Sequence, residues 1–524
     1  MRIAQMLFMG WMSFAAAMQS IAAEVDPNSG CAPEDPAAHR QRPGEPTPER
    51  LEPEDCDPTR LPTPSTSPLP GSIPVDRWRI IDSLGHPANI TDPYNTNNVL
   101  KGDRPILGAD GFSVLTATWN SLLESRHLAN QQFFNSQTAS IDAVLYKGDT
   151  IFKPPDYQVR LTPTFNYSST SANGVTTTTT SIGAQAFFFE AHLRDVSAHY
   201  DFDSVRIGIQ PVTSDFRGFV LADQPLGVRL FGTRDNNIYQ YSVGWFRRLP
   251  KNAARQNDLG AGIPANDIVM ANLYVQDLGW PGLSSEGVVI YDRNRTVSNY
   301  DVAYLGYSVD GHIRRLNLTG SVYEVVGSNV QATFAAAELS RDFDWIRVRA
   351  SGLYASGDGD PNDGKGHGFD GIIQSAIFAG SDSTFFIHQR LPLVANSVDL
   401  KQRDSLFPSM RSTSDTGASN FTNPGLELLG IGADVDLLPS LRVSMDVSHI
   451  LFANTAPLQT TLGRSDLSRT LGTDASVDAI YRPFISQNII ARLSLAKLFA
   501  APAARPLVGS SAPVSMFFNL VLTY

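Results

Sequence analysis

The chain has 524 residues and a mass of 57.0 kDa, with 42% hydrophobic and only 18% charged residues. This composition fits neither a disordered chain nor a helical membrane protein. The formal net charge of −11 argues against general nucleic-acid binding, which requires a basic surface. Two cysteines are too few for a disulfide framework or a cysteine-based metal site.

Residues 1–23 have the features of a secretory signal peptide. Arg2 precedes an apolar stretch, and the small residues Ala22 and Ala23 offer a cleavage site before Glu24. No later run of about 18 apolar residues occurs, which excludes transmembrane helices. The sequence therefore predicts an exported protein without helical membrane spans.

Residues 24–75 are rich in proline and acidic side chains. Such a segment cannot bury enough apolar surface to offset the entropy lost on ordering, so we expect a disordered periplasmic arm, which could bind a periplasmic partner. Cys31 and Cys56 both lie in this arm, and the sequence leaves open whether they form a disulfide. Residues 76–110 are expected to be a connector punctuated by Gly, Pro and Asn.

From residue 111 to residue 524 the pattern changes to alternation of apolar and polar side chains, which is typical of strands with two unlike faces. In segment 157–167, for example, odd positions are apolar and even positions are polar. The segments are about 10–14 residues long, as tilted membrane strands require, whereas soluble strands average about 5–6. We therefore expect an apolar face toward lipid and a polar face around an aqueous lumen.

Counting turns back from the C-terminus gives about 18 strands, with short periplasmic turns alternating with longer outer loops. The longest outer loop is expected at 356–425, and short turns are expected at Asp310-Gly311 and Arg341-Asp342. Pro163 within a strand indicates a bulge or the barrel rim. The predicted fold is an all-β, antiparallel transmembrane barrel over residues 111–524.

The last segment, residues 515–524, ends on an aromatic residue. One face of this segment carries Met516, Phe518, Leu520, Leu522 and Tyr524. This pattern resembles the C-terminal signal of bacterial outer-membrane barrels, which the insertion machinery recognises. We expect the segment to close the barrel against the first strand, near Phe112, in the bacterial outer membrane and its lipid.

Two motifs flank the long loop: S-G-D-G-D-P-N-D-G over residues 356–364, followed by Phe369, and F-T-N-P-G over 421–425. They are similar to motifs of the alginate export family of outer-membrane proteins. The resemblance implies an 18-stranded porin-like barrel with an Arg-rich pore that passes an anionic polysaccharide. It covers about residues 350–430 in motif terms and the barrel in strand count.

Arginines on the predicted inward faces are candidate pore-lining residues, because guanidinium groups bind carboxylates and an arginine ladder would attract anions. They are Arg160, Arg206, Arg229, Arg315, Arg347, Arg349, Arg442 and Arg492. The alternative is that these arginines pair with lumen carboxylates, which would leave a weakly selective pore. The candidate partners are Asp301, Asp434, Asp436, Asp446 and Asp478.

Oxygen donors at Asp358, Asp360, Asn362 and Asp363 suit a hard cation, so Ca²⁺ is a candidate ligand. An EF-hand-type loop, however, has Gly at its sixth and Glu at its twelfth position, and here those positions hold Asp363 and Phe369. A turn cluster in an outer loop is the alternative. No other cofactor is predicted.

The function expected from this pattern is a passive channel for hydrophilic solutes, in its narrower form anionic and polymeric ones. The alternative is a non-conducting scaffold that sheathes or docks a partner protein. The chain has no G-x-S-x-G motif and no other convincing catalytic signature, so it is not predicted to be an enzyme.

Overall fold

The computed structural model describes most of the chain from residue 98 onward. The described ranges are 98–102, 104–128, 130–148, 154–197, 201–252, 254–296, 299–394, 398–411, 418–485, 487–504, 507 and 512–524. The signal peptide, the proline-rich arm with Cys31 and Cys56, and the connector up to residue 97 lie outside these ranges.

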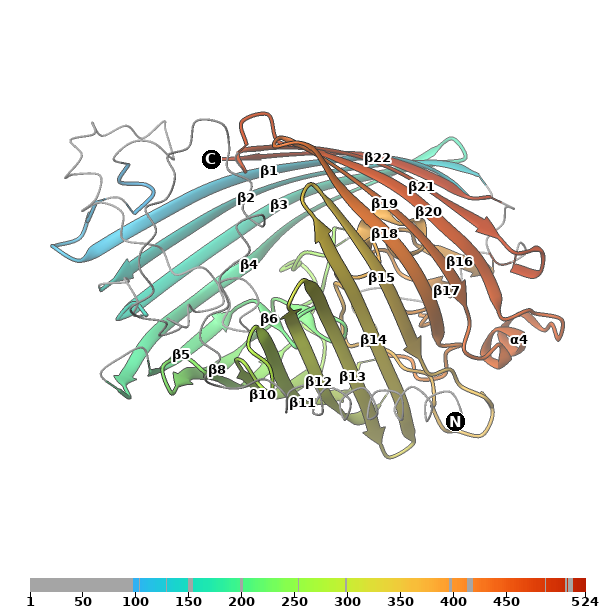
Figure 1. The fold of residues 1–524 in the computed structure, drawn as a ribbon, viewed down its shortest axis with the longest axis horizontal. Coiled ribbons are helices and arrows are strands. Elements are labelled where there is room, and N and C mark those ends of the chain that lie inside the picture. The colour runs from blue at the N-terminus through green and yellow to red at the C-terminus, as the bar shows by residue number, and fades with distance from the viewer. Residues whose placement is uncertain are drawn as a thin grey trace.

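Eighteen antiparallel strands form one closed sheet in the described part of the chain (Figure 1). Each strand pairs with the next, and the last pairs with the first. The strands are β1 (Gly111–His127), β2 (Gln131–Lys147), β3 (Tyr157–Ala172), β4 (Val175–Asp195), β5 (Phe202–Ile209), β8 (Leu226–Arg234), β9 (Tyr239–Arg247), β10 (Asn266–Val275), β11 (Leu283–Asn294), β12 (Tyr300–Ile313), β13 (Leu316–Gly327), β14 (Val330–Phe343), β15 (Ile346–Ala355), β18 (Leu426–Leu438), β19 (Leu441–Leu451), β20 (Thr470–Tyr481), β21 (Ile489–Ala500) and β22 (Val514–Thr523). The predicted fold class and strand number are confirmed.

The seam of the barrel lies between β1 and β22, as the C-terminal pattern predicts. The pairing runs from Thr118 opposite Thr523 to His127 opposite Val514. The first residues of β1 extend beyond the end of β22 and contact the connector instead. There the Leu115 N–H donates to the Leu100 carbonyl at 2.7 Å. The Lys101 ammonium lies 4.4 Å from the ring centroid of Tyr524, so the C-terminal aromatic ring also contacts the connector.

The outward face of the barrel is apolar. Exposed side chains alternate with buried or lumen-facing ones, as at Val159, Leu161 and Phe165 on β3 and at Met445 and Val447 on β19. Proteins in water rarely expose contiguous apolar surface of this extent, whereas the hydrocarbon core of a membrane requires it.

Two short turns lie farther along the chain than the sequence predicts. Asp310 and Gly311 are inside β12, and the turn falls at residues 314–315, where Arg314 has a positive φ of 55°. Arg341 and Asp342 are likewise inside β14. Gly311 is needed for close packing and not for a turn, because a Cβ there would lie 2.0 Å from the Gly282 carbonyl oxygen of the neighbouring periplasmic turn. The bulge predicted at Pro163 is confirmed by a register shift between Thr162 and Pro163.

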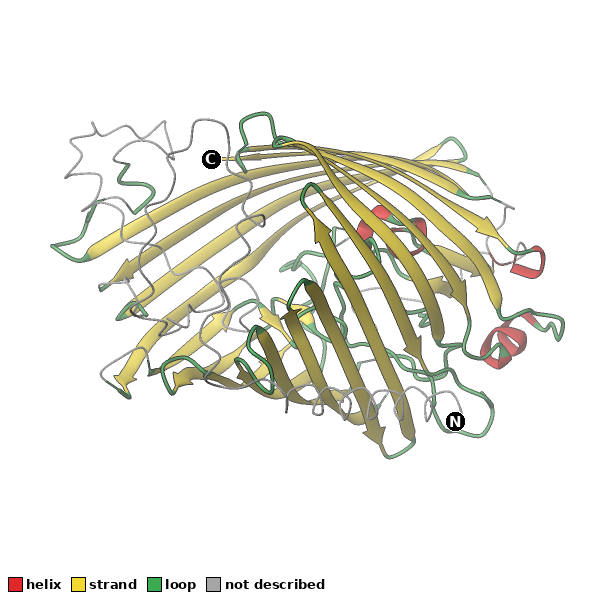
Figure 2. Cartoon of the chain, in the orientation of Figure 1, coloured by secondary structure: helices red, strands yellow, loops and turns green. Residues whose placement is uncertain are grey.

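In the part of the chain that the structure describes, helices are few and short (Figure 2). They are η1 (Ser381–Ser383), α3 (Phe385–His388), α4 (Ala456–Leu462) and η2 (Pro502–Ala504). Within the described ranges, no helix is long and apolar enough to cross a membrane.

Two outer loops fold into the barrel and together form a plug. The first, residues 210–225, contains β6 (Val212–Thr213) and β7 (Ala222–Asp223), and the second, residues 356–425, contains η1, α3, β16 (Leu391–Val394) and β17 (Val398–Lys401). The loops bind each other through their backbones: Ile372 N–H donates to the Val220 carbonyl at 2.9 Å, and Ala222 N–H donates to the Ile373 carbonyl at 2.8 Å.

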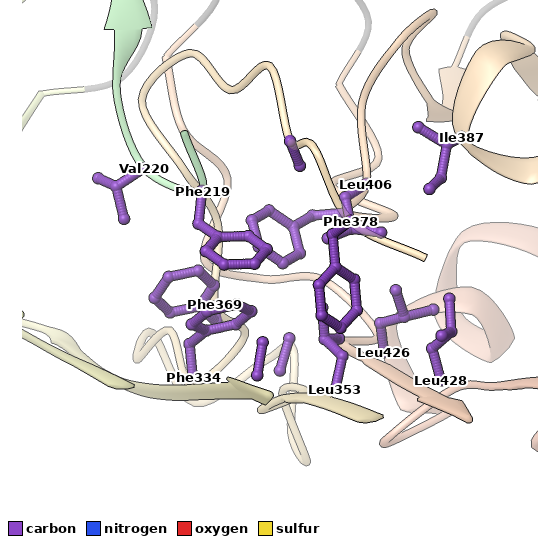
Figure 3. Packing of buried hydrophobic residues seen from close by; sticks show 14 of the residues in the cluster. Phe219, Val220, Phe334, Leu353, Phe369, Phe378, Ile387, Leu406, Leu426 and Leu428 are labelled. Carbon is purple, nitrogen blue, oxygen red and sulfur yellow. The ribbon is translucent and has the colours of Figure 1, made fainter. Parts of the chain in front are cut away.

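The plug has an aromatic core that packs on the inner face of the wall (Figure 3). Phe334 of β14 lies 4.9 Å from Phe219 and 4.8 Å from Phe369, measured between ring centroids, and all three rings are buried. Burial of one such ring stabilises the packing by about 1.5–3 kcal/mol. The plug is therefore a folded part of the molecule.

The expectation of a polar inner face holds for only part of the wall. Along β10–β14 many of the inward positions are apolar and almost fully buried: Ile268, Met270, Ile290, Val302, Tyr304, Val325 and Phe334. These residues face the plug instead of water. The polar inner face lies opposite, on β18–β22 and on β1, with residues such as Asp446, Asp478, Arg492 and Asn519.

Candidate functional site

Two cavities of similar size lie beside the plug, lined by described residues of the wall and of the outer loops. The outer cavity has a volume of ≈ 650 Å³ and reaches Lys251 and Arg255 of the loop between β9 and β10. The inner cavity has a volume of ≈ 660 Å³ and reaches His312 and Asn317 beside a periplasmic turn. Both cavities are lined by Ser381, Asp382 and Arg492, so these residues form the partition between them.

Arg492 on β21 ties the wall to the plug at this partition. Its Nη1 and Nη2 donate to the two carboxylate oxygens of Asp382, each at 2.9 Å, and its Nε donates to Asp478 on β20 at 2.7 Å. Paired N–H groups facing a carboxylate fix both distance and orientation. Ser494, two residues along β21, adds a 3.2 Å hydrogen bond to the Ser383 carbonyl.

A second wall residue, Asp474 of β20, holds the start of α3. Its carboxylate accepts the backbone N–H groups of Phe385, at 3.2 Å, and Phe386. The first N–H groups of a helix have no partner inside the helix, so a buried helix start requires an acceptor of this kind. Asp474 therefore positions the segment that follows the partition.

A third anchor joins α3 and the following loop to β1. The Glu124 carboxylate accepts from Arg403 Nη2 at 2.6 Å and lies 3.4 Å from His388 Nε2, while His388 Nδ1 lies 2.7 Å from Asp404. Burial and the Arg403 charge lower the pKa of His388, but the carboxylates of Asp404 and Glu124 outweigh them and raise it above its ordinary value. The imidazole thus joins a plug carboxylate to a wall carboxylate and lines the outer cavity.

The plug also contains a buried lysine, Lys401. Its ammonium group donates to the backbone carbonyls of Ile387, Gln389 and Gln402 at 2.6–2.9 Å. Complete burial lowers the pKa of Lys401 well below its ordinary value. These carbonyls come from two segments of the loop, the end of α3 and the residue after Lys401, so the lysine joins the two segments. Its side chain lines neither cavity.

Arg349 of β15 binds two carboxylates on neighbouring strands. It donates to both oxygens of Asp446, each at 2.7 Å, and to Asp434. The plug approaches this cluster closely at Gly380, where φ is 85° and a Cβ would lie 2.6 Å from the Asp446 carboxylate carbon. A glycine is required at this point of the plug.

The eight arginines selected from the sequence do not form one ladder. Arg347, Arg349 and Arg492 line the inner cavity, and Arg492 also lines the outer one. Arg315 lies in the turn between β12 and β13. The remaining four are Arg160, which binds Asp142; Arg206, which binds Glu190; Arg229, which donates to Ser242; and Arg442, which binds Asp436.

The alternative of paired charges describes these side chains better than a ladder of exposed cations. Four of the five carboxylates selected from the sequence, Asp434, Asp436, Asp446 and Asp478, bind those arginines. The fifth, Asp301, binds Arg295 on the outer side at 2.6 Å. The local field in the lumen is therefore set by the balance of carboxylates and guanidinium groups.

Sequence reasoning missed the plug side of the site. Asp382, His388 and Asp404 belong to the long loop, and Arg217 and Arg255 belong to two other outer loops. Loop residues follow no period, so the alternation that identified inward positions on strands gave no signal for them.

The S-G-D motif builds the point where the long loop leaves and re-enters the wall. Asp358 N–H donates to the Asn423 carbonyl at 2.8 Å, so the first motif contacts the second directly. A Cβ at Gly357 would lie 2.2 Å from the Pro424 carbonyl oxygen. Both motifs are thus explained by close backbone packing.

Three of the four side chains of the candidate Ca²⁺ site, Asp358, Asp360 and Asp363, accept local backbone hydrogen bonds through Oδ1, whereas the buried Oδ2 of Asp358 has no hydrogen-bond partner within the described ranges. The carboxylates of Asp358, Asp360 and Asp363 accept backbone N–H groups from Asp360, Asn362 and Lys365, respectively, at 2.8–3.2 Å. These are successive turns in which an Asp bonds the residue two positions ahead. Among the described residues, no three His, Cys, Asp or Glu side chains are grouped as a metal site would need, so Ca²⁺ binding by Asp358, Asp360, Asn362 and Asp363 stays a sequence prediction.

The closed barrel of 18 antiparallel strands, with its apolar exterior and inward-folded loops, is an outer-membrane β-barrel of the porin type. No protein-family model and no curated protein matches the chain. Among solved structures, the chain is similar to Pseudomonas aeruginosa OccK7 (OpdD), with 12% identity, a TM-score of 0.47, and coverage of 79% of this chain and 98% of that chain.

Two further solved structures from the same organism are similar to this chain. OccK9 (OpdG) has 11% identity and a TM-score of 0.48 over 78% of this chain and 98% of that chain. OprD has 10% identity and a TM-score of 0.47 over 79% of this chain and 95% of that chain. The class of the protein rests on barrel closure, strand number and exterior.

Proposed function

We propose that the protein is a passive outer-membrane channel for small hydrophilic solutes. The observation that carries this proposal is the pair of charged cavities, ≈ 650 and ≈ 660 Å³, on the two sides of the Arg492–Asp382 contact. A solute crossing the lumen would pass from one cavity to the other beside this ion pair. Selectivity in such a passage follows from its width and from the charges that line it.

The charges of the inner cavity favour cationic or neutral solutes. Its described lining has six carboxylates, Asp310, Glu338, Asp382, Asp434, Asp446 and Asp478, and four guanidinium groups, Arg217, Arg347, Arg349 and Arg492. A surplus of carboxylates inside a low-dielectric barrel attracts cations and repels anions.

An anionic polymer such as an alginate-like polysaccharide is the narrower form suggested by the loop motifs. Two observations argue against it: the carboxylate surplus of the inner cavity, and the structural use of both motifs at the base of the plug. A scaffold that sheathes a partner protein would need an unfilled lumen, and the packed plug core argues against that alternative.

Single-channel recording from the full chain in planar bilayers tests the proposal. We expect discrete conductance steps and, under a KCl gradient, a reversal potential that indicates cation preference. Absence of conductance would refute the channel, whereas clear anion preference would refute only the assignment of solute charge and restore the polysaccharide hypothesis.

A further inference from the structure

The barrel wall is incomplete along the outer half of β4. This strand has 21 residues and pairs with β3 along nearly all of them, but it pairs with β5 only from Phe187 to Asp195. Its neighbours on that side are short: β5, β8 and β9 have 8, 9 and 9 residues. Residues 175–186 of β4 therefore have no strand partner on the β5 side within the described chain.

The loop between β9 and β10 covers the lower part of this open edge. Asn257 Nδ2 donates to the Ala184 carbonyl at 2.8 Å, Asn252 Nδ2 donates to Ser181 Oγ at 2.7 Å, and a long 3.3 Å backbone bond joins Leu259 N–H to the Ile182 carbonyl. Two of these three bonds come from side chains, whereas a strand would continue a regular backbone ladder. The loop is therefore held to β4 by fewer hydrogen bonds than a paired strand would make, and two of the three can be released by rotation of a side chain.

The same loop separates the lumen from a groove on the outside of the barrel. Lys251 and Arg255 line the outer lumen cavity, while Asp258 and Gly260, a few residues later, line a groove of ≈ 640 Å³ on the lipid-facing side. The lumen cavity and the external groove thus lie on opposite sides of one loop.

The groove is built from one row of outward-facing positions across four strands. Trp119, Ala139, Phe165 and Ile182 are consecutive register partners on β1, β2, β3 and β4. The small Ala139 between the Trp119 and Phe165 rings leaves the space that the groove occupies.

The groove lies at the outer boundary of the apolar band. Tyr167 and Thr180 line its outer side, and the outward positions of β4 beyond it are threonines. Aromatic side chains at the edge of the apolar surface mark the membrane–water interface. Leu259 and Ile263 of the covering loop are also exposed, 53% and 57%. An alkyl chain of an outer-leaflet amphiphile fits such surroundings.

We propose that this loop closes a lateral route between the outer lumen cavity and the outer leaflet, used by single-chain amphiphiles. The alkyl chain occupies the groove at Trp119, Ala139 and Phe165, and the polar head group occupies the lumen cavity beside Lys251 and Arg255. Movement of the loop away from Ser181 and Ile182 joins the two spaces. The route goes beyond the proposed function, since ion conduction along the lumen does not require it.

Photolabelling tests the route. The full chain with Cys31→Ser and Cys56→Ser is placed in phospholipid vesicles and exposed to two dodecyl glucoside probes, one with a diazirine at the end of the alkyl chain and one with a diazirine on the sugar head group. We expect the alkyl-chain probe to label the groove, near residues 119, 139 and 165, and the head-group probe to label the lumen, near residues 251 and 255. Absence of lumen labels from the head-group probe would overturn the route.

A lock distinguishes lateral entry from entry through the aqueous mouth. The lock is the double variant Ser181→Cys and Asn252→Cys, bridged by oxidation or by a short bis-thiosulfonate. It should remove lumen labels and keep groove labels, and reduction of the bridge should restore the lumen labels. Equal lumen labelling in the locked and reduced states would overturn the proposal.

Gly183→Val should open the route instead of closing it. Its Cβ alone would lie 1.8 Å from the Asn257 carbonyl oxygen, so the side chain would displace the loop. Lumen labelling should then rise, and unchanged labelling would count against the route.

Filling the groove gives a matched control. Ala139→Phe should abolish labelling in the groove and the lumen, whereas Ala350→Phe, at another lipid-facing position, should change neither. Equal labelling in both variants would refute the groove as the entry site. Conductance is recorded in parallel: its absence in every variant would count against the channel, whereas retained conductance with lock-insensitive labelling would count against the lateral route alone.

Discussion

Arg492 of β21 and Asp382 of η1 form a two-point ion pair, with both N···O distances at 2.9 Å, between the two lumen cavities. Asp382 is 46% exposed on its side chain, so water screens the pair, and its contribution is about 0–1 kcal/mol. An interaction of this free energy can change the fraction of time for which the passage between the cavities is wide. It is too weak to determine whether the barrel folds.

Replacing Asp382 by Asn should therefore widen the passage more often. Arg492 keeps its bond to Asp478 in this variant, so the wall stays intact. A loss of about 1 kcal/mol changes an equilibrium roughly fivefold, and we expect an increase of that order in open probability. Asp466→Asn, which removes an exposed pair with Arg464 on an outer loop, is the control. Equal open probabilities in the two variants would show that the Arg492 pair does not restrict the passage.

Replacing Arg349 by Ser should shift ion selectivity further toward cations. The change leaves Asp434 and Asp446 without their shared guanidinium group in the inner cavity. Arg442→Ser removes a pair with Asp436 that is 45% exposed and does not line that cavity, so it should change selectivity less. The reversal potential under a KCl gradient measures both effects. An unchanged potential for Arg349→Ser would mean that this cluster does not act as a filter.

The attachment of α3 to β1 should weaken as the pH rises. The pKa of His388 is raised in the folded protein, so its protonated form contributes stability that is complete below its ordinary value of about 6.5. This contribution is lost as the pH rises through the higher native value. Limited proteolysis of the long loop across this range should show faster cleavage at alkaline pH, and His388→Gln should remove the dependence. Faster cleavage at acidic pH would contradict the assignment.

Gly425 should be irreplaceable where the plug re-enters the wall. Its φ is 62°, and a Cβ would lie 2.5 Å from the Ala355 carbonyl oxygen and from the Gly357 nitrogen. Gly425→Ala combines a left-handed backbone cost of about 1–2 kcal/mol with this overlap. Gly364→Ala is the matched control, because φ is 73° there and no atom lies within 4 Å of the added Cβ. Loss of heat-resistant electrophoretic mobility should occur at a lower temperature for Gly425→Ala. Equal midpoints would show that the motif is not a structural crossing.

The sequence alone determined the architecture of the wall. Alternation with a period of two is a local property, because successive side chains of a strand point to opposite faces whatever the rest of the chain does. It therefore led to the strand number and placed Met516 and Phe518 on one face, which the structure shows to be exposed. The bulge at Pro163 followed from another local property, because proline cannot donate a hydrogen bond to the neighbouring strand. The two misplaced turns, at Asp310-Gly311 and Arg341-Asp342, show its limit, because a glycine can serve close packing as well as a turn.

Only the tertiary structure decided what fills the lumen. Phe219, Phe334 and Phe369 are 115 and 35 residues apart along the chain, and nothing in their local sequence pairs them. Asp382 meets Arg492, and Leu259 meets Ile182, only because loops without any period fold back onto distant strands. Periodicity reports how a strand faces its immediate surroundings, whereas the passage and the gap beside β4 depend on contacts between segments far apart in sequence.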